Sequence, residues 1–277
     1  MCELLGISSS VKVRAGRYFN AFRRRGDEFL EGGGHPHGWG IALYPDGKGV
    51  MLIKEPIPAA SSQLAGFLSK YEMLCSRIFV AHIRKATKGV VTFSNSHPFS
   101  REAFGRDYVF AHNGTIRRFG KSPRGRHAPI GDTDSERLFC YLLNFIRQRR
   151  TIEWNDDAFV ELWRFLISIN RLTGSKAPKR PNKMNILLSD GETLLAYTDL
   201  YARGTLHRLL LQEEGDVPSD GNNPSDCHRF KDGTAKSVAV IATTPLPHNK
   251  TWEPMEPGEL CALREGQVVF SNGSACV

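Results

Sequence analysis

The chain opens Met1-Cys2-Glu3-Leu4-Leu5-Gly6, and this stretch is the most informative in the sequence. Methionine aminopeptidase removes Met1 when the second residue is small, which would leave Cys2 with both a thiol and a free α-amine. Their ordinary pKa values are about 8.5 and about 7.7–8.0. Such an amine can take the thiol proton and later return it, so one residue supplies nucleophile and base. Chance alone can also place a cysteine second.

A second segment reads Ala81-His82-Ile83-Arg84-Lys85-Ala86-Thr87-Lys88-Gly89. We predict a strand over residues 78–84 that ends at Arg84, whose planar guanidinium matches a carboxylate bidentately. The alternative is an ordinary surface arginine at the end of a strand. Asn95-Ser96-His97-Pro98-Phe99 follows, where His97 before Pro98 could be a turn residue or part of the site, and we expect a structural role.

A third segment, Phe110-Ala111-His112-Asn113-Gly114-Thr115, contains the pair Asn-Gly between apolar runs, which is a strong hairpin signal. The segment also offers chemistry. The side-chain amide of Asn113 and the backbone N–H of Gly114 could converge as two donors on a developing oxyanion.

The fourth segment, Gly131-Asp132-Thr133-Asp134-Ser135-Glu136, stands directly before a predicted helix over residues 135–149. One interpretation is helix capping by Thr133, Asp134 or Ser135. The other gives Asp134 a carboxylate that holds an ammonium group. Together, Asp134 and Arg84 would then suit the two charged groups of an amino-acid head.

These four segments, in this order, resemble the class II glutamine amidotransferases, which share a processed cysteine and the patterns H-x-R-x-A-T-x-G, H-N-G and T-D-[ST]-E. The resemblance implies that Cys2 is the nucleophile and that Asn113 and Gly114 form the oxyanion hole. It also implies that Arg84 binds the substrate α-carboxylate, with Thr87 nearby, and that Asp134 binds the α-amine. Gly38-Trp39-Gly40 matches the glycine-rich strand that faces the cysteine in this family.

The match is closest to the small YafJ-type branch, which shares Asn185 to Gly191, the run 241–246, Thr251-Trp252 and Pro257-Gly258-Glu259. It extends over nearly the whole chain, so we expect a single domain over residues 2–277 without an acceptor domain. The implied fold is the N-terminal-nucleophile (Ntn) hydrolase sandwich, in which helices flank two mostly antiparallel sheets in four layers.

The apolar patterns independently indicate an α+β fold, because many strands surround a few helices in the middle of the chain. Helices are predicted over residues 61–71, 135–149 and 157–172. Residues 213–237 are rich in Gly, Pro, Asn, Asp and Ser, and we expect a mobile surface loop there. The six cysteines are scattered, which argues against a disulfide framework, and Cys75 is expected to be a small buried hydrophobic residue.

The net charge of +8 is concentrated in the stretches 14–25 and 117–126, which we expect to be solvated loops. They contain no nucleic-acid-binding motif, so a catalytically silent basic binding module is the weaker alternative function. No stretch approaches the roughly 18 apolar residues of a membrane span, and no signal peptide is evident, which makes the cytoplasm the expected location.

The function expected from the resemblance is hydrolysis of a γ-glutamyl amide through a Cys2 thioester, without a metal or organic cofactor. The substrate would be glutamine or another γ-glutamyl compound, because Lys85 and Lys88 replace the Trp and His that many full-length amidotransferases carry. Two versions remain open. Ammonia passes to a separate synthetase subunit, or the protein is a self-contained γ-glutamyl hydrolase.

Overall fold

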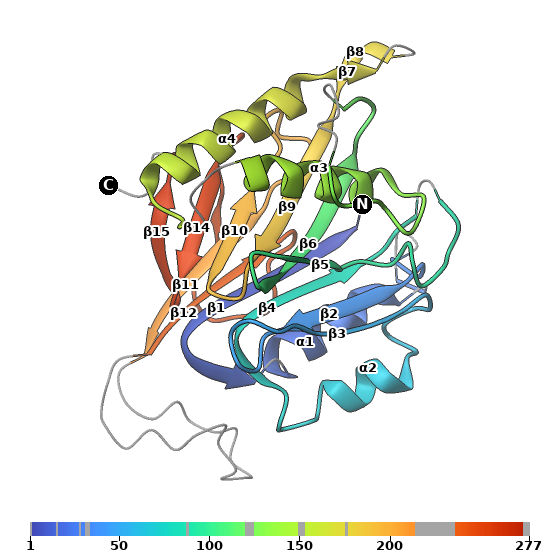
Figure 1. Cartoon of the computed structure of the whole chain (residues 1–277). Helices are drawn as coiled ribbons and strands as arrows, with labels where there is room; N and C mark the ends of the chain where they lie inside the picture. Colours follow the sequence, from blue (N-terminus) through green and yellow to red (C-terminus); the bar gives the residue numbers. More distant parts are fainter. Residues whose placement is uncertain are drawn as a thin grey trace.

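The computed structural model describes residues 2–14, 16–27, 29–30, 34–86, 89–119, 125–148, 153–174, 177–213 and 236–273. Two antiparallel sheets, of seven and six strands, form the centre of this part of the molecule (Figure 1). In spatial order, the strands of the larger sheet are β13 (Glu253–Pro254), β11 (His207–Glu213), β12 (Lys236–Ala242), β1 (Glu3–Arg14), β4 (Cys75–Ile83), β2 (Trp39–Leu43) and β3 (Met51–Glu55).

The smaller sheet is built from later parts of the chain. Its strands, in spatial order, are β15 (Gln267–Ser271), β14 (Leu260–Arg264), β10 (Thr193–Tyr197), β9 (Lys183–Ser189), β6 (Arg106–Thr115) and β5 (Phe99–Ala103). A separate pair, β7 (Thr173–Gly174) and β8 (Ala177–Pro181), lies at one end of the molecule (Figure 1).

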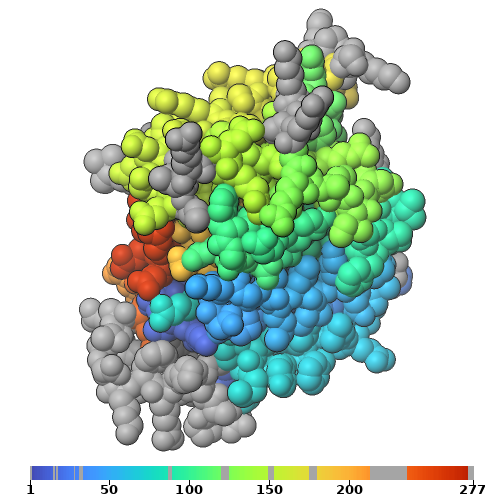
Figure 2. All heavy atoms as spheres, in the orientation of Figure 1, coloured from blue at the N-terminus to red at the C-terminus, as the bar shows by residue number. Residues whose placement is uncertain are grey.

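Helices cover the outer face of each sheet (Figure 1). The larger sheet carries α1 (Gly16–Arg23), α2 (Gln63–Leu68) and the 3-10 turn Arg24–Gly26, and the smaller sheet carries α3 (Asp134–Gln148) and α4 (Asp156–Arg171). In the space-filling view, α3 and α4 form the yellow-green upper surface, and β2, β3 and α2 form the blue to cyan lower part (Figure 2).

Three apolar cores hold these layers together. The core between the sheets includes Leu4 and Val80 from one sheet and Val109 and Leu187 from the other. Each outer core joins a sheet to its helices, as Phe22 of α1 does on the larger sheet. The predicted α+β fold with four α/β/β/α layers is therefore confirmed. Within the described residues, no helix is both long and apolar enough to cross a membrane.

Two expectations about local structure are wrong. The basic stretch 14–25 is largely helix α1, because Phe19 and Phe22 are buried against the larger sheet. The Asn113-Gly114 pair is not a hairpin turn, since β6 continues through it to Thr115 and pairs with β9. In this case a strand from a distant part of the chain outweighs the local turn signal.

The cysteine expectation is wrong at one position. Cys75, at the start of β4, is half-buried and disulfide-bonded, whereas Cys2, Cys140 and Cys261 are free thiols. Spacing along the sequence does not show which cysteines meet in space. Of the loop predicted over 213–237, residues 214–235 lie outside the described residues, while Glu213 ends β11 and Lys236 begins β12.

Candidate active site

Strand pairing in the larger sheet brings the first and second sequence motifs to one edge. Glu3 pairs with Ile83, and Ile83 also pairs with Trp39 on its other side. The residues just beyond these pairs are Cys2 and Arg84, and the backbone N–H of Arg84 donates to the carbonyl oxygen of Gly38 at 2.8 Å. Consequently, Cys2 and Arg84 leave the sheet side by side.

The alternation of side chains along each strand decides what faces the space between the sheets. Leu4 and Val80 belong to the core between the sheets, so Cys2 and Arg84, at even spacing from them, face the same way. The side chains of strand β6, in the opposite sheet, alternate in the same way. Its Ala111 lies in that core, and Asn113 therefore points toward the larger sheet.

Asn113 and Cys2 meet across the gap between the sheets. The side-chain amide of Asn113, only 2 % exposed, donates a hydrogen bond to the carbonyl oxygen of Cys2 at 2.7 Å. A primary amide has two N–H groups, and one hydrogen bond to Cys2 occupies one of them. The other is available to a ligand held beside the cysteine.

The Cys2 thiol is half-buried and contacts the backbone of Lys85. The N–H of Lys85 lies 3.3 Å from the sulfur, and the carbonyl oxygen of the same residue lies at 3.5 Å. Burial raises the pKa of the thiol, whereas the Lys85 hydrogen bond and the Arg84 guanidinium favour the thiolate. A backbone donor and a nearby cation are what a thiolate nucleophile requires.

Arg84 is 3 % exposed and held by the segment that follows it. Its two terminal nitrogens donate to the carbonyl oxygens of Val90, at 3.1 Å, and Gly89, at 3.5 Å. Burial lowers the pKa of Arg84, while Cys2 and Asp132 act in the opposite direction. The guanidinium is thus fixed in position at the inner edge of the site.

Gly114 is required by the close approach of β6 to β9. A Cβ atom at this position would lie 2.0 Å from the carbonyl oxygen of Lys183 and 2.5 Å from Nε2 of His112. Any side chain would collide with backbone here. The chain consequently brings its main-chain atoms, rather than a side chain, to this part of the site.

His112 is buried on the opposite face of β6 and has two hydrogen-bond partners. Its Nε2 lies 3.1 Å from the carbonyl oxygen of Lys183, and its Nδ1 lies 2.9 Å from Oγ of Ser135. Burial lowers the pKa of His112, so the neutral ring is favoured. A carbonyl can only accept, so Nε2 carries the proton and Nδ1 accepts from the Ser135 hydroxyl.

The fourth motif forms the start of α3. Oγ1 of Thr133 accepts from the backbone N–H of Glu136 at 3.2 Å, which is a capping contact. Asp134 begins the helix, and its Oδ2 accepts from the backbone N–H of Ile116 at 2.6 Å. This bond ties the carboxylate to the residue that follows β6.

A single pocket brings most of the candidate residues together. Its lining includes Cys2, Arg84, Gly114 and Asp134, as well as Lys85, Ala86, His97, His112, Thr115, Thr133 and Ser135. Asn113 reaches Cys2 from the wall of β6. Thr87, which the sequence also suggested, lies outside the described residues.

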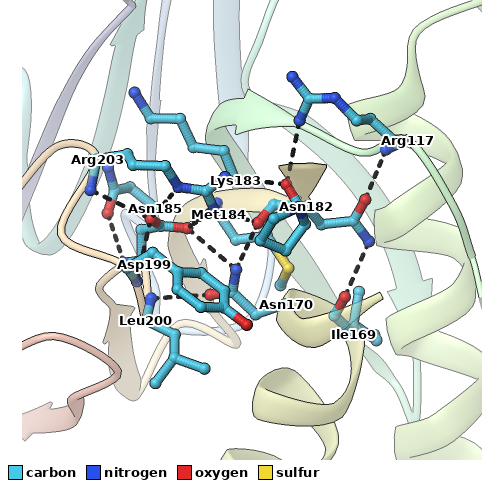
Figure 3. Close-up of polar contacts among 12 residues, drawn as sticks. Arg117, Ile169, Asn170, Asn182, Lys183, Met184, Asn185, Asp199, Leu200 and Arg203 are labelled. Atoms are coloured by element: carbon cyan, nitrogen blue, oxygen red, sulfur yellow. Dashed lines mark hydrogen bonds and ion pairs between the residues drawn. The ribbon is translucent and has the colours of Figure 1, made fainter. Parts of the chain in front are cut away.

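A buried polar network lies at the start of β9, the strand that pairs with β6 (Figure 3). The Asp199 carboxylate accepts from Nε of Arg203 at 2.9 Å and from the backbone N–H of Met184 at 3.0 Å. Burial acts to raise the pKa of Asp199, but its hydrogen bonds and the Arg203 charge outweigh burial and hold it below its usual value. The network fixes the start of β9. There the carbonyl oxygen of Lys183 accepts a hydrogen bond from Nε2 of His112.

Sequence patterns missed several of these features. Lys85 and Ser135 stand in the second and fourth motifs, but neither pattern shows that the Lys85 backbone contacts the thiol or that the Ser135 hydroxyl contacts His112. Asp199 and Arg203 meet through a turn after β10, which periodicity does not show. His112 itself stands in the third motif, and its neighbour Asn113 was the signal that could have drawn attention to it.

The sequence of this chain is similar to those of several known proteins. A family model described as "Glutamine amidotransferases class-II" matches residues 1–276. The Escherichia coli protein "Putative glutamine amidotransferase YafJ" is 34% identical over 94% of this chain and 96% of its own length. A Methanocaldococcus jannaschii protein, "Uncharacterized protein MJ1515", is 38% identical over 98% of this chain and 72% of that protein.

Solved structures with a similar fold are also found. A "predicted glutamine amidotransferase" from Pseudomonas aeruginosa PA01 superposes with a TM-score of 0.63 and 30% identity, covering 97% of this chain and 100% of that one. The glutamine phosphoribosylpyrophosphate amidotransferase of Bacillus subtilis has a TM-score of 0.58 at 14% identity. This chain matches 50% of the Bacillus protein, and the likeness there concerns the fold alone.

Proposed function

The chain belongs to the class II glutamine amidotransferases, and from this premise we propose that it hydrolyses the γ-amide of glutamine or of a γ-glutamyl compound through a thioester on Cys2. Removal of Met1 frees the α-amine of Cys2, which takes the thiol proton. The sulfur then attacks the γ-carbonyl carbon, and the carbonyl oxygen becomes an oxyanion.

The second half of the reaction regenerates the thiol. The protonated amine gives its proton to the leaving nitrogen, the carbon–nitrogen bond breaks, and ammonia or an amine departs from the γ-glutamyl thioester. Water then attacks the thioester as the amine takes its proton. The carbon–sulfur bond breaks, glutamate leaves, and the sulfur recovers the proton.

The bond from Asn113 to the Cys2 carbonyl is the observation that carries this proposal. It holds the side-chain amide beside the sulfur-bearing residue, with a second N–H left to donate to an oxyanion. Gly114 in the same wall is the proposed second donor. Arg84 and Asp134, which line the pocket, would bind the α-carboxylate and the α-ammonium of the glutamyl head.

A turnover assay tests the proposal. Protein shown by mass to start at Cys2 is expected to release glutamate from glutamine or from γ-glutamyl dipeptides, and Cys2→Ala is expected to abolish release. Cys140→Ala, a change at a buried free thiol of α3, serves as the matched control and should keep full activity. No release from any of these substrates by the trimmed protein would refute the proposal.

The same assay separates the two versions of the function. Rapid hydrolysis of a γ-glutamyl dipeptide, with glutamine a poor substrate, would indicate a self-contained γ-glutamyl hydrolase. Preferential hydrolysis of glutamine would indicate release of ammonia for a separate synthetase subunit.

A further inference from the structure

His97 is a buried polar residue that the proposed chemistry does not use. It lines the same pocket as Cys2 and Arg84, and its side chain is 4 % exposed. Neither of its ring nitrogens forms a hydrogen bond within the described part of the chain. Buried side-chain polar atoms usually have a partner, so a histidine on the wall of a pocket with two unsatisfied nitrogens points to a ligand.

The ring is held in place by packing. It packs in a tilted arrangement against His82, with a centroid separation of 4.2 Å, and against Phe99 at 4.5 Å. Its backbone is fixed as well, because a Cβ atom on Gly40 would lie only 2.4 Å from the His97 carbonyl oxygen. The orientation of the imidazole is thereby set before any ligand enters.

The surroundings also set its charge. Burial, together with the neighbouring His82, His112 and Arg84, holds the pKa of His97 well below its usual value. The ring is therefore neutral, with one N–H donor and one acceptor nitrogen. A neutral donor beside a fixed guanidinium suits an anion, because it adds a hydrogen bond without adding a second cation.

We propose that His97 is a substrate-binding residue whose ring N–H donates to the α-carboxylate of the γ-glutamyl group, next to Arg84. This inference rests on the proposed function for the identity of the ligand. A carboxylate has roughly four lone-pair sites, so it can accept from both residues. Arg84 already uses N–H groups on both of its terminal nitrogens for Gly89 and Val90, and the ring N–H of His97 would add a further donor for the carboxylate.

Binding of glutamate, the reaction product, provides a test that does not depend on turnover. Calorimetric titrations would compare the trimmed protein with His97→Phe, using glutamate and its α-carboxamide analogue. Loss of a hydrogen bond to a charged group typically weakens binding by about 10- to 100-fold. We expect a loss of that size for glutamate and a much smaller one for the carboxamide, with partial recovery in His97→Gln.

His82→Phe is the matched control. His82 packs against the same ring, is fully buried and likewise has no hydrogen-bond partner for its ring nitrogens within the described residues, but it is not among the described residues that line the pocket. Its replacement should leave glutamate affinity within about threefold. Phenylalanine at position 97 removes unsatisfied polar atoms, so the thermal stability of that variant should be equal or higher.

Several outcomes would overturn the inference. An unchanged glutamate affinity in His97→Phe, an equal loss for both ligands, or an equal loss in His82→Phe would each do so, as would a trimmed protein that binds no glutamate. If His97-dependent binding is found but no substrate is hydrolysed, the proposed function fails and this inference stands. Normal hydrolysis with no dependence of glutamate binding on His97 would support the proposed function and overturn the role of His97.

Discussion

The side-chain amide of Asn113 donates to the carbonyl oxygen of Cys2 across 2.7 Å, and this bond joins the two sheets at the candidate active site. Strand β6 supplies the amide, and the residue before β1 supplies the carbonyl. The contact fixes the main chain of Cys2 through the same group that we propose as an oxyanion donor. A change at Asn113 should therefore affect chemistry more than ligand binding.

We expect Asn113→Ala to lower kcat for glutamate release by about 10²–10³-fold, the usual cost of one lost oxyanion donor. KM should change little, because the amide contacts the reacting carbonyl rather than the amino-acid head. Steady-state kinetics on trimmed protein would measure both constants. A kcat within threefold of the parent would contradict the assignment of Asn113.

Gly114→Ala should damage the fold and the activity together. Its Cβ would meet the Lys183 carbonyl oxygen at 2.0 Å, so β6 and β9 would have to separate. We expect the free energy of unfolding, measured with denaturant, to fall by about 1–3 kcal/mol. Gly66→Ala in α2 is the control, because nothing lies within 4 Å of its Cβ position. That change should leave stability equal or raise it by up to about 1 kcal/mol.

The pH dependence of Cys2 alkylation should respond to Arg84. Burial raises the pKa of the thiol, so the rate of reaction with iodoacetamide should rise with pH through a midpoint above the ordinary thiol value. The Arg84 guanidinium favours the thiolate, and Arg84→Leu should shift the midpoint further upward. Arg106→Leu, which breaks ion pairs with Asp190 and Glu192, should leave the midpoint in place. A downward shift in Arg84→Leu would contradict this electrostatic account.

Three buried histidines should make the protein sensitive to acid. Burial lowers the pKa of His82 to about 3, and it lowers the pKa values of His97 and His112 as well. Below about pH 6.5 the unfolded chain binds protons that the folded protein does not, so stability is present above that pH and is lost as the pH falls. Each histidine contributes a slope of up to about 1.36 kcal/mol per pH unit.

Denaturant unfolding at several pH values between about 6.5 and about 4 would measure that slope. His82→Phe should reduce it by one proton's contribution while leaving the slope of the other two histidines. A free energy of unfolding that does not change over this range would show that these rings are protonated in the folded protein.

Much of the fold was predictable because its signals are local. The apolar stripes of α3 and α4 lie within single segments, and the observed bounds differ from the predicted ones by one residue. Helix α1 was missed because its arginines dominate the pattern, although Phe19 and Phe22 are buried. The spacing of the cysteines along the sequence did not reveal that Cys75 is disulfide-bonded.

The candidate site was predictable to the extent that it uses side chains in motifs. Cys2, Arg84 and Asp134 were expected, and the structure places them around one pocket. The Lys85 backbone at the thiol and the burial of His97 could not be predicted, because both follow from how two sheets stack. The alternation of side chains along a strand shows which face of the sheet Cys2 and Arg84 share, but only once the pairing of β1 with β4 is known.

The most direct test of the central claim is the mass of the protein after reaction with a glutamine analogue that carries a diazoketone in place of the amide. We predict that protein beginning at Cys2 gains one adduct, and that peptide mapping finds it on the Cys2 sulfur. Saturating glutamate should slow this labelling. No adduct, or an adduct on another of the six cysteines, would contradict the assignment of Cys2 as the nucleophile.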